Sequence, residues 1–96
     1  MGGATTLSDF CCPMYLREVE SRIRNKWDEH QSERGLVKVQ FTIQRDGRVT
    51  DLSIVQHGTF LLDRASSVPF TGLMLPPLPA EFQDPSLTLR LTFEYK

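Results

Sequence analysis

The feature that most constrains this chain is a pair of segments on either side of an Asp46-Gly47 dipeptide. Over residues 37–43, apolar residues alternate with polar ones, which is typical of a strand with one buried face. Asp-Gly favours a two-residue type I′ hairpin turn, because both central positions need a positive φ. The sequence therefore predicts an antiparallel hairpin across residues 36–56.

The hydrophobic pattern also predicts the register of this hairpin. A two-residue loop at 46–47 makes residue 45 face residue 48, and the apolar residues of both strands then share one face. A slip by one residue would move one apolar set to the opposite face of the sheet. The predicted cross-strand pairs are Phe41–Leu52, Val39–Ile54 and Ile43–Thr50.

A helix is predicted before the hairpin, from about residue 13 to about residue 29. Its apolar residues recur at helical spacing, and Pro13 suits a first helical turn. Ser8 or Asp9 is a candidate N-cap. The predicted buried face consists of Cys12, Leu16, Val19, Ile23 and Trp27, with Trp27 as the core anchor.

A second, short helix is predicted at about residues 60–67, with Thr59 as its N-cap. Asp63 lies where a negative charge suits the helix dipole. Pro69 ends this helix, and a further turn is expected to start there. Its predicted buried face consists of Leu61, Leu62, Ala65 and Val68.

The last strand has the most regular alternation in the chain, over residues 87–96. Residues 75–79, before it, include three prolines and are expected to be extended, with Leu75 and Leu78 as packing residues. Pro76 and Pro79 also match a P-x-x-P motif, but a stiff connector explains them better.

The predicted element order is helix, strand, strand, helix, strand, which is an α+β fold. A hairpin followed by a helical crossover favours a three-stranded antiparallel sheet in the order 2-1-3, with both helices on one face. Residues 1–12 are interpreted as a flexible linker remnant and residues 13–96 as one domain.

Composition excludes several functional classes. The formal net charge of −1 offers no basic excess for holding a nucleic-acid backbone. No apolar run is long enough to span a bilayer, and the chain does not open with a signal peptide. The adjacent cysteines Cys11 and Cys12 are not expected to bond each other, which leaves free thiols or an intermolecular crosslink.

No metal, cofactor or catalytic site is predicted. The metal-ligand candidates Cys11, Cys12, His30 and His57 lack the usual spacings of zinc sites. A nucleophilic site could only be assembled from His57, Asp63, Ser66 and Ser67, and no Gly-x-Ser-x-Gly elbow supports it.

The last strand is the predicted functional element, because it forms an edge of the sheet. An edge strand leaves a row of main-chain N–H and C=O groups unpaired, and this one has neither proline nor glycine to blunt it. Such an edge can accept a partner strand. An edge guarded by charge, or covered by a homodimer partner, is the alternative. The candidate binding residues are Leu87, Thr88, Leu89, Arg90, Leu91, Thr92, Phe93, Glu94 and Tyr95.

Together these motifs resemble the C-terminal domain of the TonB/TolA family over about residues 14–95. The chain departs from the family pattern after Trp27, where Asp-Glu-His stands in place of a proline, and at Pro69 and Gly72, which interrupt the second helix. The motifs that carry the resemblance are Tyr15, Val19, Ile23 and Trp27, the 37–54 segment around Asp46-Gly47, Gly58 with Leu61, Leu62, Asp63 and Ala65, the Pro-Pro-Leu-Pro of 76–79, and residues 87–93.

The resemblance implies a periplasmic domain of an inner-membrane-anchored energy transducer, with the anchor upstream of this chain. It further implies that a short segment of an outer-membrane, TonB-dependent transporter adds to the last strand. Inner-membrane proton-channel proteins would be partners of the full-length protein. The alternatives are a TolA-like envelope scaffold, a structural homodimerisation domain, and a small enzyme using His57 and Asp63.

Overall fold

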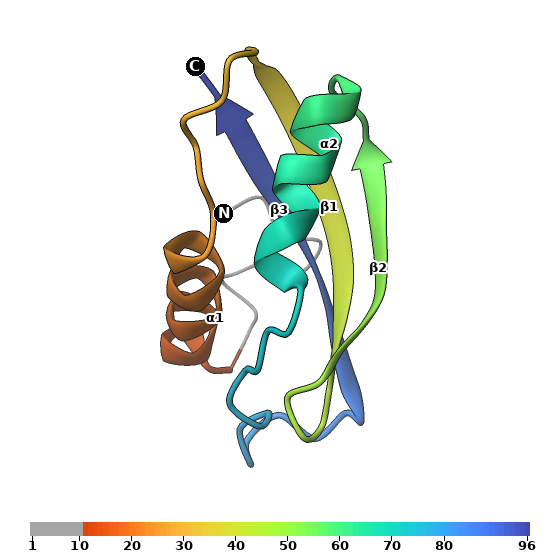
Figure 1. Ribbon diagram of the computed structural model, residues 1–96. Coiled ribbons are helices and arrows are strands. Elements are labelled where there is room, and N and C mark those ends of the chain that lie inside the picture. The colour runs from red at the N-terminus through yellow and green to blue at the C-terminus, as the bar shows by residue number, and fades with distance from the viewer. Residues whose placement is uncertain (1–10) are drawn as a thin grey trace.

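The computed structural model describes residues 11–96, which form two helices, one 3₁₀ turn and one sheet (Figure 1). The three strands are antiparallel and lie in the order β2-β1-β3, so the predicted α+β fold with sheet order 2-1-3 is confirmed. The elements are α1 (Pro13–Asn25), β1 (Gly35–Gln44), β2 (Val49–Gln56), α2 (Phe60–Ser67), η2 (Val68–Phe70) and β3 (Ser86–Tyr95).

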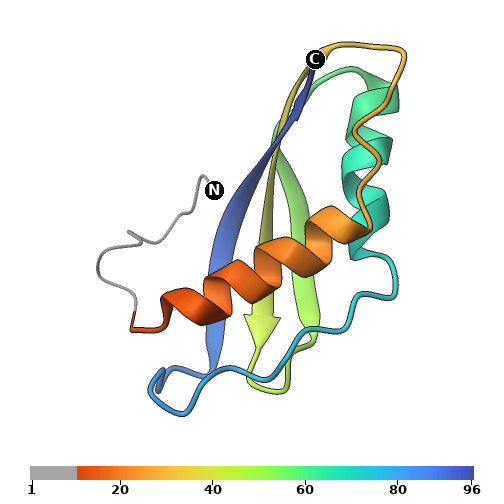
Figure 2. The ribbon, with the colours of Figure 1, turned by 90° about the vertical axis from the view of Figure 1, so that its left-hand side faces the viewer.

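One face of the sheet carries the core. Both helices pack on this face, and Figure 2 shows α1 crossing the direction of the strands while α2 runs roughly along them. The opposite face is polar, with a hydrogen bond between the Thr42 and Thr88 hydroxyls at 2.9 Å. The sheet residues buried under the helices are Val37, Val39, Phe41 and Ile43 of β1 and Leu87, Leu89, Leu91, Phe93 and Tyr95 of β3.

The hairpin lies where the sequence predicts it, but its turn is one residue longer. Gln44 N–H donates to the Arg48 carbonyl at 2.7 Å, and Gly47 N–H donates to the Gln44 carbonyl at 2.9 Å. Gly47 has a φ of +95°, whereas Asp46 is not among the residues with positive φ. These contacts define a three-residue loop that ends in glycine, so the predicted type I′ turn is wrong.

The longer loop shifts the register next to the turn, where Ile43 pairs with Val49 rather than with Thr50. A bulge then places Asp51 and Leu52 opposite Phe41, with Asp51 at a φ of +54°. The bulge restores the predicted Val39–Ile54 pair but overturns the Phe41–Leu52 pair. Leu52 consequently stays 41% exposed.

Helix α1 begins at Pro13 as predicted, but it ends at Asn25 rather than near residue 29. Its N-cap is Cys12, which contradicts the expectation of a cap by Ser8 or Asp9. At its end, Trp27 N–H bonds to the Arg24 carbonyl at 3.1 Å, an i→i+3 bond that tightens the last turn. This ending turns Trp27 back onto Phe93 of β3, so tertiary packing decides where the helix stops.

Helix α2 has the predicted bounds and the predicted cap, with the Leu62 N–H donating to the Thr59 hydroxyl at 3.3 Å. The turn η2, which contains Pro69, follows as expected. The predicted buried face is only partly correct. Leu62 is buried, but Leu61 is 38% and Val68 54% exposed, because the helix turns Leu62 and Ser66 toward the sheet.

The segment between η2 and β3 is held against the end of β1. Leu75 and Leu78 are buried, which confirms their predicted packing role. Leu78 N–H donates to the Arg45 carbonyl at 3.1 Å, and the Tyr15 hydroxyl donates to the Pro76 carbonyl at 2.7 Å. The connector therefore fixes the start of β3 relative to the hairpin.

Cys11 and Cys12 are joined by a disulfide, contrary to the expectation for adjacent cysteines. Their Cα atoms are 3.8 Å apart, which is the spacing of any neighbouring residues across a trans peptide. The bond therefore closes a small ring within one dipeptide and links no two elements of the fold.

The linker predicted for residues 1–12 falls largely on residues 1–10, which lie outside the described part of the chain. Within residues 11–96, neither helix has the length and apolar character needed to cross a bilayer.

Candidate functional site

The outer edge of β3 is the candidate site. All ten residues of β3 pair with β1 in one continuous register, from Gly35–Tyr95 to Gln44–Ser86, without a bulge. Within residues 11–96, no other strand pairs with the opposite side of β3. A regular strand with an open edge is a template for adding another strand.

The hairpin geometry indicates which main-chain groups face outward. The Gln44 N–H points toward β2, since it bonds Arg48 across the hairpin. Main-chain groups alternate in direction along a strand, so Ile43 points toward β3 and forms the bonded pair with Leu87. The same alternation turns the N–H and C=O groups of five β3 residues toward the open side, namely Ser86, Thr88, Arg90, Thr92 and Glu94, and the last four are among the predicted residues.

The nine predicted residues therefore divide into two groups. The five odd-numbered residues point their side chains into the core and their main-chain groups toward β1. The four even-numbered residues present main-chain groups at the edge and side chains on the polar face. Arg90, for example, donates to Gln40 Oε1 across that face at 2.9 Å.

The other edge of the sheet is less suited to pairing. β2 contains two register shifts against β1, one at Asp51 and Leu52 and one near Val55. Bulges twist an edge and break the even spacing of its donors and acceptors. The β3 edge is thus the regular one of the two.

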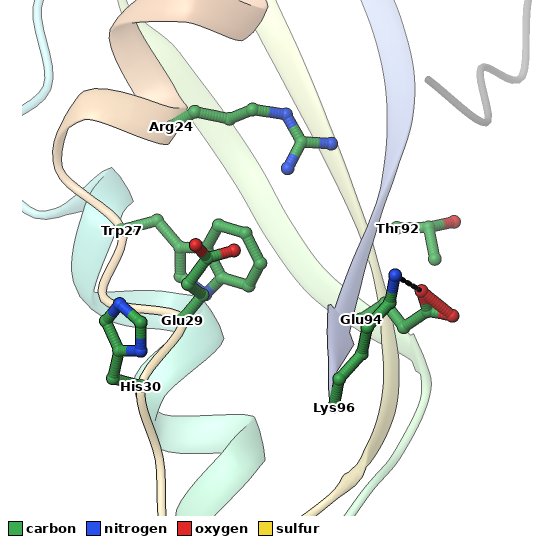
Figure 3. A pocket seen from close by; sticks show the side chains of 7 residues that line it. All are labelled: Arg24, Trp27, Glu29, His30, Thr92, Glu94 and Lys96. Atoms are coloured by element: carbon green, nitrogen blue, oxygen red, sulfur yellow. Dashed lines mark ion pairs between the residues drawn. The ribbon is translucent and has the colours of Figure 1, made fainter.

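A pocket of about 440 Å³ lies against the C-terminal half of β3 (Figure 3). One wall comes from the end of α1 and the segment that follows it, and the other comes from β3. Its lining residues are Arg24, Trp27, Glu29, His30, Thr92, Glu94 and Lys96.

Trp27 connects the two walls of this pocket. Its ring packs edge-on against Phe93, with ring centres 5.1 Å apart, and against Tyr95, with centres 5.3 Å apart. The guanidinium of Arg24 lies 5.5 Å from the centre of the Trp27 ring. The predicted role of Trp27 as the core anchor of the helix is confirmed only in part, because Trp27 packs against the core but is partly buried and lies beyond the end of α1.

The segment after Trp27 is shaped by Asp28. The Asp28 carboxylate accepts the His30 main-chain N–H at 2.9 Å, and its carbonyl accepts the Gln31 side-chain amide at 3.1 Å. These two bonds fix the start of the segment from which Glu29 and His30 line the pocket.

The pocket contains both signs of charge. Arg24 is paired with Glu20 at 3.0 Å, and Lys96 is paired with Glu94 at 3.7 Å. The ion pairs found in residues 11–96 do not include Glu29. Among the described residues, its carboxylate is thus the one charge of the pocket lining outside the ion pairs of Arg24 and Lys96.

The residues weighed for catalysis serve the start and packing of α2. Asp63 accepts the Gly58 N–H at 2.8 Å and lies 2.8 Å from His57 Nδ1. Ser66 Oγ donates to the Leu62 carbonyl, and Ser67 Oγ donates to the Asp63 carbonyl. Both hydroxyls therefore bond to carbonyl groups of their own helix, and neither bonds to His57 as a nucleophile would.

The metal-ligand candidates are also separated. Cys11 and Cys12 are bonded to each other, His57 pairs with Asp63, and His30 lines the pocket. In the part of the chain that the structure describes, no three His, Cys, Asp or Glu residues come together as a metal site.

Sequence reasoning missed the pocket wall of Arg24, Glu29 and His30. The one available signal was the Asp-Glu-His run directly after Trp27, which reads as an ordinary solvated loop. Only the packing of the end of α1 and the segment that follows it against β3 brings these side chains to the end of that strand.

Comparison with protein-family profiles matches residues 13–60 to the family described as TonB C terminal. The chain belongs to the TonB C-terminal domain family. The match covers α1, β1 and β2 and ends at the first residue of α2, so the resemblance in the sequence is confirmed for this half of the TonB-like domain. Neither the curated proteins nor the solved structures contain a match to the chain.

Proposed function

We propose that this TonB-like domain binds a short periplasmic segment of an outer-membrane, TonB-dependent transporter by strand addition to β3. In the full-length protein, this contact would transmit proton-motive-force energy from inner-membrane partners to the transporter. The domain would then act in the periplasm, attached to an inner-membrane anchor outside this chain.

The observation that carries the proposal is the open and regular edge of β3. Four of the nine predicted residues, Thr88, Arg90, Thr92 and Glu94, present outward main-chain groups. The family assignment supports the same kind of protein–protein contact.

The energetics suit reversible coupling. About four new main-chain hydrogen bonds, each worth a net 0.5–1.5 kcal/mol, contribute roughly 2–6 kcal/mol. Side-chain packing adds to this, and association costs roughly 4–15 kcal/mol. The balance corresponds to binding of about micromolar strength at best, which allows a force transmitter to engage and release.

A proline at Thr92 tests the proposal. Thr92→Pro removes an outward N–H without removing a bond to β1, and proline is tolerated on edge strands. We expect this variant to fold by circular dichroism but to lose most of its affinity for synthetic peptides copied from the periplasmic segments of transporters. Thr92→Val is the matched control, because it keeps the N–H and should bind like the parent.

Hydrogen exchange in the unaltered protein gives a second measurement that does not depend on the variant folding. Bound peptide should slow exchange of the Arg90 and Thr92 N–H groups while leaving those of Val49 and Ile54 on β2 unchanged. Protection on β2 alone, or full affinity in a folded Thr92→Pro variant, would overturn strand addition to β3.

A homodimer paired through the same edge is the second candidate, since a second copy would use the same outward groups. Sedimentation at micromolar concentration distinguishes it, because the transporter-binding model predicts a monomer that forms a 1:1 complex with peptide. A TolA-like scaffold would bind other periplasmic proteins at this edge and not the transporter peptides.

A further inference from the structure

The pocket beside β3 is lined from both sides of the sheet. Thr92, Glu94 and Lys96 alternate with the buried Phe93 and Tyr95, so their side chains lie toward the polar face. The remaining lining residues come from the helix side, where Trp27 packs on Phe93. A pocket with walls on both faces of an edge strand must lie against the edge itself.

An extended chain that added to β3 would therefore enter this pocket at Thr92 and Glu94. Side chains along an extended chain alternate between the two faces of the sheet. Every second side chain would point to the helix side, and at this position it would meet the Trp27 indole (Figure 3). The pocket thus forms a subsite for one side chain of the bound strand, at the C-terminal end of the β3 edge.

We propose that this pocket selects a lysine or arginine side chain at the helix-facing position of the bound strand. The inference rests on the proposed strand addition and names the chemistry that the edge prefers. The apolar stem of the basic side chain would pack on Trp27, and its charged head would pair with Glu29.

The charges of the pocket favour a cation over an anion. Arg24 and Lys96 are already paired with Glu20 and Glu94, whereas Glu29 is without an ion-pair partner within residues 11–96. The Arg24 guanidinium lies 5.5 Å from the centre of the Trp27 ring, so the apolar stem of the incoming side chain would pack on the part of the indole that Arg24 leaves free, with its charged head on Glu29.

Three synthetic peptides test this subsite. Each is an acetylated and amidated heptapeptide of alternating threonine and valine, with lysine, norleucine or glutamate at the centre. Norleucine keeps the apolar stem of lysine without its charge. We expect the lysine peptide to bind about two- to fivefold more tightly than the norleucine peptide, the range of an exposed ion pair, and the glutamate peptide to bind most weakly.

Glu29→Gln should abolish the difference between the lysine and norleucine peptides. Glu18→Gln is the matched control, since it removes the same charge from α1 but does not line the pocket. This control variant should retain the full preference for lysine. Both substitutions are at exposed positions, so the fold should be unchanged.

Two sets of signals separate the subsite from strand addition. The amide signals of Arg90 and Thr92 report strand addition, and Trp27, the single tryptophan of the chain, reports the pocket through its indole N–H signal and its fluorescence. The inference requires both to respond to the lysine peptide.

If all three peptides shift the strand amides equally and Trp27 is silent, the subsite is wrong and the proposed function stands. If no peptide shifts the strand amides, strand addition is wrong, and the subsite fails with it. If the Trp27 signals respond while the strand amides do not, strand addition is also wrong, and the subsite fails with it.

Discussion

The indole Nε1 of Trp27 donates a hydrogen bond to the Tyr95 hydroxyl at 2.7 Å, which ties the segment after α1 to the last residue of β3. The Tyr95 hydroxyl also lies 2.8 Å from Ser66 Oγ. Because Ser66 uses its one hydrogen on the Leu62 carbonyl, Tyr95 must donate to Ser66. The chain of bonds joins the pocket, the edge strand and α2.

Replacement of Tyr95 by phenylalanine should break this chain. Tyr95→Phe leaves the partly buried Trp27 N–H without its acceptor, and we expect a loss of about 1–3 kcal/mol in the free energy of unfolding. Urea denaturation measures it. In a double-mutant cycle with Ser66→Ala, the two losses should be less than additive. Additive losses would mean that the two residues act independently.

Removal of the Arg45 guanidinium should loosen the connector before β3. It donates to four carbonyl oxygens, those of Leu78, Pro79, Phe82 and Asp84. Arg45→Met should cost about 1–3 kcal/mol in urea denaturation. Arg48→Met is the control, because the Arg48 side chain pairs with the exposed Asp46 and touches no part of the connector, and it should cost under about 0.5 kcal/mol. Equal losses in the two variants would mean that the Arg45 hydrogen bonds do not hold the connector in place.

Alanine at Gly47 should destabilise the domain far more than alanine at Gly72. Both glycines have positive φ, at +95° and +66°, so each substitution carries a backbone cost of about 1–2 kcal/mol. At Gly47 a Cβ would also lie 2.1 Å from the Leu75 carbonyl oxygen, whereas at Gly72 it would meet open space. Thermal unfolding should show Gly72→Ala folded and Gly47→Ala severely destabilised. Similar melting temperatures would disprove the close approach of the connector.

Alkaline pH should weaken the fold through Tyr15. Burial raises the pKa of the Tyr15 hydroxyl above its ordinary value of 10.0, because the phenolate would lose its hydration. The unfolded chain therefore releases this proton at lower pH than the folded domain. The contribution is complete below pH 10 and declines as pH rises through the folded pKa. Urea denaturation across this range should show the decline in the parent and a smaller one in Tyr15→Phe.

In the hairpin, the local sequence pattern predicted the positions of the strands but not their exact pairing. Alternation and Asp46-Gly47 located both strands and the turn, because these signals depend on neighbouring residues alone. The exact pairing did not follow. Gly47 packs against the carbonyl of Leu75, which lies in a distant segment. The bulge at Asp51 has no signal in the residue types of β2.

The candidate site divides in the same way. The sequence predicted β3 as a regular edge strand, but which of its main-chain groups face outward follows only from its pairing with β1. It did not reveal the pocket, because Glu29 and His30 come near Thr92 only when the segment after α1 packs against β3. It also mistook the state of Cys11 and Cys12, which depends on ring closure within the dipeptide.

By itself, the sequence determined which segments are helices and strands, their order in the sheet and the strand left at its edge. These properties follow from the spacing of apolar residues and from residues that start or stop an element. Tertiary structure alone decided the length of the turn, the bulges of β2, the end of α1 and the pocket beside β3. Each of these depends on packing between residues far apart in the chain, such as Trp27 with Tyr95. The local spacing of apolar residues does not reveal such contacts.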